Sequence, residues 1–283
     1  MKPAPFGYHR PADLEEACAA LAADPGAKVL AGGQSLLPLL SMRLAAPSAL
    51  VDLSGVPGLD RMRVDSDGVH VGALARQADV AADPRVGEAQ PLLPLALANV
   101  AHATIRNRGT VVGSLAHADA AAELPAVLLL LGGSVTAMSV RGRRTVPASE
   151  LFTGPMETTL APDEIAVEAH FPALPPAAGV AFEEISRRNG DYAIAGVAAL
   201  VETEGGAVTA ARVAYVAVAE TATVVDAGTD LTDLEVVADR AVGGLEVVAD
   251  LHADADYRGH LARVLTARVL SAALARARGE AAA

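Results

Sequence analysis

Two glycine-containing turns, each followed by an apolar run, constrain this chain more than any other feature. The first lies in Lys28 to Leu40, KVLAGGQSLLPLL, where a strand-like run passes through a glycine pair into leucines. The second lies in Thr104 to Leu131, TIRNRGTVVGSLAHADAAAELPAVLLLL, where Gly109 and Gly113 precede a helix pattern. Glycine allows close backbone approach, and the amides of such turns favour an anion. The pattern predicts a phosphate site, with a dinucleotide diphosphate as the commonest candidate, although no G-x-G-x-x-G is present.

Composition narrows the class of protein. The chain has 283 residues, 52% of them hydrophobic, which favours two domains with buried cores. Its net charge of -12 argues against a nucleic-acid partner, because phosphate backbones are bound by clustered Lys and Arg. The one cysteine, Cys18, excludes a disulfide framework and an iron-sulfur cluster held by this chain alone. Any redox cofactor of this chain is therefore expected to be organic.

The sequence gives no signal for a membrane span or a metal site. Its first ten residues lack the apolar core of a signal peptide, and the apolar run 124–131 is shorter than the roughly 18 residues of a membrane helix. We therefore expect a cytoplasmic protein. His117 with Asp119, and His252 with the acidic residues that follow it, lack further ligands at a familiar spacing. We expect neither pair to bind a metal.

Hydrophobic periodicity predicts an α+β fold. The expected strands are 28–31, 50–53, 68–74, 134–140, 165–171, 181–186, 193–201 and 211–219. The expected helices are 14–21, with Asp13 as its cap, 77–82, 92–100, 124–131 and a C-terminal one. Three strands followed by helices indicate a second α+β domain after the Pro-rich stretch 174–179. The hexapeptide LEVVAD occurs at 234–239 and 245–250, and we interpret both copies as similar helix faces.

Four segments together resemble a known family. They are AGGQSLLPLLSMRL at 31–44, the stretch 104–131 quoted above, LFTGPMETTL at 151–160 and RRNGDYAIAGVA at 187–198. In this order they resemble the FAD-binding medium subunit of molybdenum hydroxylases, of the carbon monoxide dehydrogenase and xanthine dehydrogenase type. The tail DLHADADYRGHLARVL at 250–265 is similar to the last segment of that family. The resemblance thus spans nearly the whole chain.

The resemblance implies both an architecture and partners. It implies a PCMH-type FAD-binding domain over 1–173, with α/β subdomains of about 1–55 and 56–173. A smaller α+β domain with a three-stranded antiparallel sheet is implied over 179–283. The implied assembly is a heterotrimer, or a dimer of heterotrimers, in which a small subunit carries two [2Fe–2S] clusters and a large subunit carries molybdopterin. In this assembly the chain itself binds FAD and transfers electrons.

The resemblance also implies a cofactor site and no catalytic acid–base pair in this chain. The FAD diphosphate would lie between the two turns, Lys28 would border the adenosine, and Glu123 would contact the ribityl or phosphate region. Leu160 would lie near the adenine, and Tyr192 would approach the isoalloxazine ring. The implied turn residues are Ala31, Gly32, Gly33, Gln34, Ser35, Thr110, Val111, Val112, Gly113 and Ser114.

Val112 departs from the family pattern, in which this position is glycine. If the position required a positive φ, a β-branched side chain there would cost about 1 kcal/mol or more and weaken FAD binding. This departure keeps open an alternative in which the chain is a flavin-free scaffold of the same complex. A stand-alone FAD oxidase is a further alternative, although the sequence shows no convincing catalytic cluster.

Overall fold

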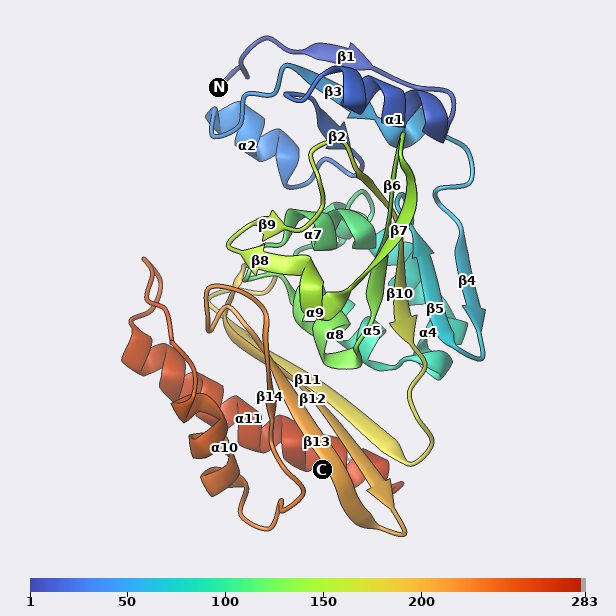
Figure 1. Ribbon diagram of the computed structural model, residues 1–283. Coiled ribbons are helices and arrows are strands. Elements are labelled where there is room, and N and C mark those ends of the chain that lie inside the picture. Colours follow the sequence, from blue (N-terminus) through green and yellow to red (C-terminus); the bar gives the residue numbers. More distant parts are fainter. Residues whose placement is uncertain (281–283) are drawn as a thin grey trace.

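The computed structural model describes residues 1–280 and contains three main sheets arranged along the molecule (Figure 1). A small N-terminal sheet lies at one end, a five-stranded sheet lies in the middle, and a four-stranded sheet lies at the other end. Within these residues, every helix is too short or too polar to cross a membrane. The observed mixture of helices and strands confirms the predicted α+β class.

The N-terminal sheet is entirely parallel. Its strand order is β1 (Gly7–His9), β3 (Ala49–Asp52) and β2 (Lys28–Leu30). Helices α1 (Leu14–Ala23) and α2 (Leu36–Met42) are the crossover connections that parallel strands require. As predicted, the Asp13 side chain caps α1, accepting a 2.8 Å hydrogen bond from the Glu16 amide. Each strand thus leads into a turn at the same edge of the sheet.

The middle sheet is antiparallel and carries most of the helices on one face. Its strand order is β4 (Met62–Asp65), β5 (Gly68–Gly72), β10 (Ile165–Pro172), β6 (Ser134–Ser139) and β7 (Gly142–Pro147). The accompanying elements are α3 (Gln77–Ala82), α4 (Pro84–Ala89), α5 (Leu92–Leu97), α6 (Ala103–Arg106), α7 (Val111–His117), α8 (Glu123–Leu131), α9 (Ala148–Leu151) and the hairpin β8 (Phe152–Gly154) with β9 (Glu157–Thr158). This layer connects the two ends of the molecule.

The C-terminal sheet has four strands where the sequence predicted three. They are β11 (Ala178–Ser186), β12 (Ala193–Glu204), β13 (Ala207–Val216) and β14 (Thr223–Asp226), all antiparallel. The fourth strand was missed because it is short and only partly buried. Helix α11 (Ala255–Ala277) covers one face of this sheet, and helix α10 (Leu234–Gly243) packs on α11 (Figure 1).

The other face of the C-terminal sheet packs on the middle layer, mainly on α8 and α5. Successive residues of β12 point alternately to the two faces of the sheet. Ala198 and Leu200 pack in the core of the middle layer, whereas Val197 and Ala199 pack in the core beneath α11. Double coverage explains why β12 is apolar at nearly every position rather than at every second one. The same position between layers explains why α8 is buried almost all round.

The repeated hexapeptide LEVVAD corrects one sequence interpretation. The copy at 234–239 forms α10, begun by Asp233, whose side chain accepts hydrogen bonds from the Glu235 and Val236 amides. The copy at 245–250 is not helical, and its Val248 amide instead donates to the Val218 carbonyl oxygen. The same six residues therefore have two conformations. The Asp233 cap begins a helix at the first copy, whereas a tertiary hydrogen bond holds the second copy in a non-helical conformation.

We predict that Gly179→Ala destabilises the protein through the packing of β11 on α11. A Cβ atom at Gly179 would lie 2.0 Å from the Ala273 carbonyl oxygen, so the helix backbone would have to move. We expect a loss of about 1–3 kcal/mol in the free energy of unfolding, measured by urea denaturation. Gly244→Ala is the matched control, because a Cβ there meets open space. Equal stability of the two variants would contradict this packing.

Candidate functional site

A cavity of about 720 Å³ lies where the N-terminal sheet, α7, α8 and a loop of the C-terminal domain meet. This size lies within the range of cofactor sites. All the site residues expected from the sequence line it except Val111. They are Lys28, Ala31, Gly32, Gly33, Gln34, Ser35, Thr110, Val112, Gly113, Ser114, Glu123, Leu160 and Tyr192. The structure thus brings together residues separated by more than 150 positions.

The two glycine turns touch each other at one wall of the cavity. A Cβ atom at Gly32 would lie 2.3 Å from the Arg108 carbonyl oxygen and 2.9 Å from the Cα atom of Gly109. Gly33 has φ +72°, a conformation that favours glycine. The backbone amide of Gln77 donates a 2.9 Å hydrogen bond to the Gly109 carbonyl oxygen and holds the second turn in place. The turns therefore form one continuous cradle.

The first turn presents backbone donors to the cavity. It runs from β2 into α2, and in residues 1–280 the backbone amides of Gln34 and Ser35 donate to no protein acceptor. Leu37 is the first residue there whose amide bonds back, to the Gly33 carbonyl oxygen at 3.0 Å. Free amides beside a cavity are suited to an anionic group.

The second turn corrects two sequence interpretations. Thr110 caps α7, and its hydroxyl accepts a 3.1 Å hydrogen bond from the Gly113 amide. Val111 is completely buried and packs in the hydrophobic core instead of lining the cavity. Val112 is a helical residue without a positive φ, and it is 2% exposed. The suspected backbone strain at Val112 is therefore wrong, because a helix turn accommodates valine where a left-handed turn would not.

Glu123 is a buried carboxyl group in the first turn of α8. Burial, reinforced by Glu184 and Asp119, raises its pKa to about 8. Glu184, on the neighbouring β11, is partly buried, and this burial raises its pKa to about 7. At neutral pH Glu123 is therefore mostly protonated, so its hydroxyl can donate a hydrogen bond and the side chain would not repel an anion.

Tyr192 reaches the cavity from the C-terminal domain. It follows a turn in which Gly190 has φ +82° and lies so close to His102 that a Cβ would be 2.5 Å from that imidazole ring. Arg188 and Asp191 close the turn with a 2.9 Å ion pair. The Tyr192 ring is exposed, and its pKa is raised by burial of its hydroxyl and by the nearby Asp119 and Glu123. An exposed ring at a cavity mouth suits stacking on a flat ligand.

Several lining residues were not expected from the sequence. Gln77 is 5% exposed, and its Oε1 atom has no hydrogen-bond partner in the described residues. Met156 and Thr158 contribute from the β8–β9 hairpin, and His117 and Asp119 line the cavity as well. Their proximity depends on contacts between distant segments, although Met156 and Thr158 lie within the 151–160 motif.

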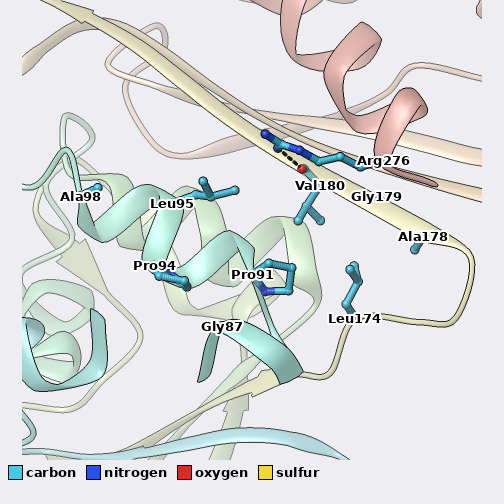
Figure 2. Close-up of a pocket in the computed structure, with 10 residues that line it drawn as sticks. All are labelled: Gly87, Pro91, Pro94, Leu95, Ala98, Leu174, Ala178, Gly179, Val180 and Arg276. Atoms are coloured by element: carbon cyan, nitrogen blue, oxygen red, sulfur yellow. Dashed lines mark hydrogen bonds between the residues drawn. The ribbon is translucent and has the colours of Figure 1, made fainter. Parts of the chain in front are cut away.

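A second hollow, of about 590 Å³, lies at the junction of the middle layer and the C-terminal domain (Figure 2). Pro91 and Leu95 of α5 face Val180 of β11 across it. The charged side chain in its lining, Arg276, donates a 2.6 Å hydrogen bond to the Val180 carbonyl oxygen. Because that guanidinium is already hydrogen-bonded to the protein, the second hollow has fewer polar groups available to a ligand than the first cavity.

The fold and the first cavity together define a dinucleotide-binding flavoprotein rather than a Rossmann-type dehydrogenase. Residues 4–174 match the FAD binding domain in molybdopterin dehydrogenase, and residues 180–273 match the CO dehydrogenase flavoprotein C-terminal domain. The chain belongs to the family of FAD-binding medium subunits of the molybdenum hydroxylases, a family of oxidoreductases. This confirms the resemblance noted in the sequence.

Individual relatives cover nearly the whole chain. The nicotine 6-hydroxylase medium subunit of Paenarthrobacter nicotinovorans is 42% identical, over 98% of this chain and 100% of its own. The carbon monoxide dehydrogenase structure from Hydrogenophaga pseudoflava superimposes with a TM-score of 0.92 at 36% identity, covering 98% and 99%. Quinoline 2-oxidoreductase from Pseudomonas putida 86 gives 0.91 at 40% identity, also covering 98% and 99%.

We predict that Glu123 makes stability fall as pH rises. The pKa of Glu123 in the folded chain is about 8, above its ordinary value of 4.5, so between these values the folded chain holds a proton that the unfolded chain releases. The free energy of unfolding should therefore fall through this window, by at most about 1.4 kcal/mol per pH unit, and level off above pH 8. Urea denaturation of the flavin-free chain at several pH values measures this slope.

Glu123→Gln should reduce that slope, because the amide does not titrate, and leave the contribution of Glu184, whose pKa is also raised. Glu88→Gln, on the exposed side of α4, is the control and should keep the parental slope. A Glu123→Gln variant with the parental pH dependence would show that the carboxyl group is ionised throughout the range.

Proposed function

We propose that this chain is the FAD-binding electron-transfer subunit of a heterotrimeric molybdenum hydroxylase. In this proposal it accepts electrons from [2Fe–2S] clusters in a small partner subunit and passes them to an external acceptor. A large partner subunit holds molybdopterin and carries out the hydroxylation. The observation that carries the proposal is the contact of Gly32 with Arg108 and Gly109, which unites both glycine turns into one cradle.

The residues of the cavity fit FAD. Backbone amides at Gln34 and Ser35, with the hydroxyl group of Ser114, would hold the diphosphate. Lys28 and Leu160 would border the adenosine, and Tyr192 would lie against the isoalloxazine. FAD, when bound, supplies the ability to accept and release electrons, and the surrounding hydrogen bonds and charges tune its potential.

Glu123 has a specific part in this proposal. As a protonated carboxyl group beside the diphosphate, it would donate to a ribityl or phosphate oxygen. An ionised carboxylate in the same place would repel the two negative charges of the diphosphate. Burial of Glu123 therefore supports cofactor binding by keeping this side chain neutral.

The corrected geometry of Val112 removes the reason for a flavin-free scaffold, since its helical conformation leaves the cradle intact. The stand-alone oxidase is disfavoured because the relatives that match nearly the whole chain are named as subunits or chains of larger enzymes. A dimer of heterotrimers and a cytoplasmic location belong to the same proposal. In this proposal the molybdenum subunit determines the substrate.

The first prediction from this proposal concerns the cradle. Gly32→Ala forces the Arg108 carbonyl away and should separate the two turns, so we expect FAD affinity to fall by about tenfold or more, equivalent to about 1.4 kcal/mol. Fluorescence titration of the flavin-free chain with FAD measures this. Gly87→Ala is the control, since its nearest neighbour would be 3.9 Å away. Unchanged affinity in Gly32→Ala would contradict the cradle.

The second prediction concerns the assembly. Expressed with its genomic neighbours, the chain should purify with an iron-sulfur subunit and a molybdopterin subunit, with one FAD per chain. Substrate should bleach the visible absorbance of the flavin in the complex, whereas the flavin of the isolated chain should stay oxidised, because that chain lacks the source of electrons. An assembled complex without stoichiometric FAD would overturn the proposal, and bleaching of the isolated chain by substrate would favour the oxidase.

A further inference from the structure

Two histidines lie directly opposite each other on neighbouring antiparallel strands of the middle sheet. His70 of β5 pairs in register with His170 of β10, and their rings stack with centroids 4.4 Å apart. Their strand neighbours Val69, Val71, Ala169 and Phe171 belong to the core. Because side chains alternate along a strand, both imidazoles lie on the face of the sheet away from that core. This face is separate from the cofactor cavity.

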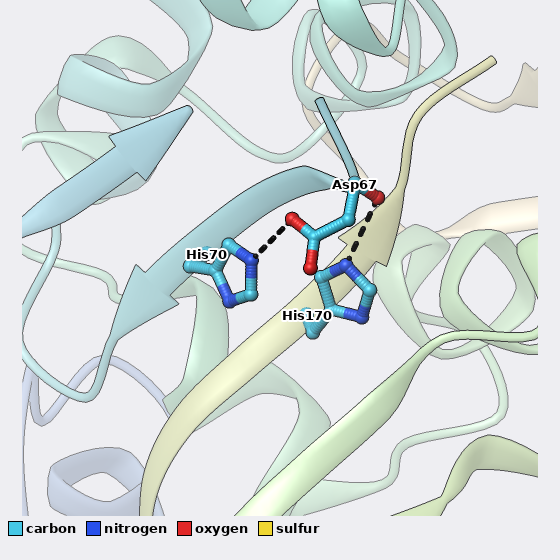
Figure 3. A group of neighbouring side chains, drawn as sticks. All are labelled: Asp67, His70 and His170. Carbon is cyan, nitrogen blue, oxygen red and sulfur yellow. Dashed lines mark hydrogen bonds and ion pairs between the residues drawn. The ribbon is translucent and has the colours of Figure 1, made fainter. Parts of the chain in front are cut away.

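Asp67 joins this pair from the β4–β5 turn (Figure 3). Its Oδ1 atom lies 3.0 Å from the Nε2 atom of His70, and its carbonyl oxygen accepts a 3.2 Å hydrogen bond from the Nε2 atom of His170. The Ala173 amide also donates to that carbonyl, at 3.0 Å. Gly68, with φ +141°, lets the turn approach β10, since a Cβ there would be 2.1 Å from the Phe171 carbonyl oxygen. The backbone therefore fixes Asp67 above both rings.

The three side chains offer a compact set of ligand atoms. One carboxylate oxygen and one nitrogen of each ring all lie within 4.8 Å of one another. Ligands of a tetrahedral zinc ion, bonded at roughly 2.0–2.2 Å, are roughly 3.3–3.6 Å apart. The two rings are stacked with an interplanar angle of 22°, so they would have to turn about their Cα–Cβ and Cβ–Cγ bonds until both ring planes meet at one ion. Two imidazoles and one carboxylate with an open fourth position match the ligands that zinc prefers.

His70 has a buried ring nitrogen without a hydrogen-bond partner in the described residues. The residue is 9% exposed, and this nitrogen is Nδ1. The Glu168 Oε1 atom lies 3.6 Å from that nitrogen. With a cation on Nε2, the Nδ1–H group would face Glu168, which is the arrangement of an orienting carboxylate beside a metal-bound histidine.

The surrounding charges suit a divalent cation. Asp65, whose Oδ1 atom is 3.9 Å from His70 Nε2, is paired with Arg63, so Asp67 and Glu168 supply the negative charge that faces the rings. Two carboxylates balance two positive charges without a further counter-ion. Asp67 is exposed, which gives an ion access from solvent.

We propose that Asp67, His70 and His170 bind a divalent transition metal of the zinc type, with Glu168 orienting His70. The ion would join the β4–β5 turn to the last residues of β10, immediately before the chain enters the C-terminal domain. This site neither requires nor alters the proposed binding of FAD.

The test is titration of the chelator-treated full-length chain with zinc chloride by isothermal calorimetry. We expect one zinc ion per chain. His170→Gln should weaken binding by more than tenfold, and Glu168→Gln by about tenfold, as expected for the loss of an orienting carboxylate. His252→Ala is the matched control and should bind as the parent does, because that histidine lies beside acidic residues outside the cluster.

Zinc-dependent thermal stabilisation of the parent, absent in His170→Gln, gives a second readout, because only binding to the folded chain raises its melting temperature. Circular dichroism of His170→Gln verifies that the variant is folded. Absence of a one-site isotherm in the parent would overturn the proposal and leave a hydrogen-bonded histidine pair. Equal zinc binding by the parent and His170→Gln, or its loss in His252→Ala, would overturn it as well.

Discussion

The close contact between the two glycine turns is the constraint on which the rest of this molecule depends. Gly32 belongs to the N-terminal parallel sheet, whereas Arg108 and Gly109 belong to the helical layer of the middle sheet. Their backbones approach to a distance that leaves no room for a methyl group, so the relative position of these two units is set where the cavity forms. The same contact that joins the units therefore shapes the binding site.

The C-terminal domain is fixed to this frame by a sheet that is buried on both faces. Because β12 contributes alternate residues to two cores, the sheet has little freedom to tilt against α8 without exposing apolar surface. The turn before β12 is held further by the fit of Gly190 on His102, and it carries Tyr192 to the cavity mouth. A residue of the second domain thus becomes part of a site built mainly by the first.

The sequence predicts the local features of the fold, but not the features that depend on contacts between distant segments. Helix α1 with its Asp13 cap, and helix α8 with its long apolar run, follow from short patterns that carry their own physical cause. The cavity lining followed from recognisable motifs, yet Gln77 was missed because its role depends on a turn 32 residues away. His70 and His170 were missed for the same reason: strand register, which the sequence does not display, places them opposite each other.

The cavity also shows how an acidic chain can accommodate an anion. With a net charge of -12, the protein does not attract a diphosphate through its overall field. The cradle instead offers backbone amides, whose positions are fixed by Gly33 and by the start of α2, and a carboxyl group kept protonated by burial. Fixed dipoles inside a partly desolvated cavity interact more strongly than exposed charges in salt solution do. The two glycine turns therefore contribute backbone amides in fixed positions, and not clustered cationic side chains, to the proposed flavin site.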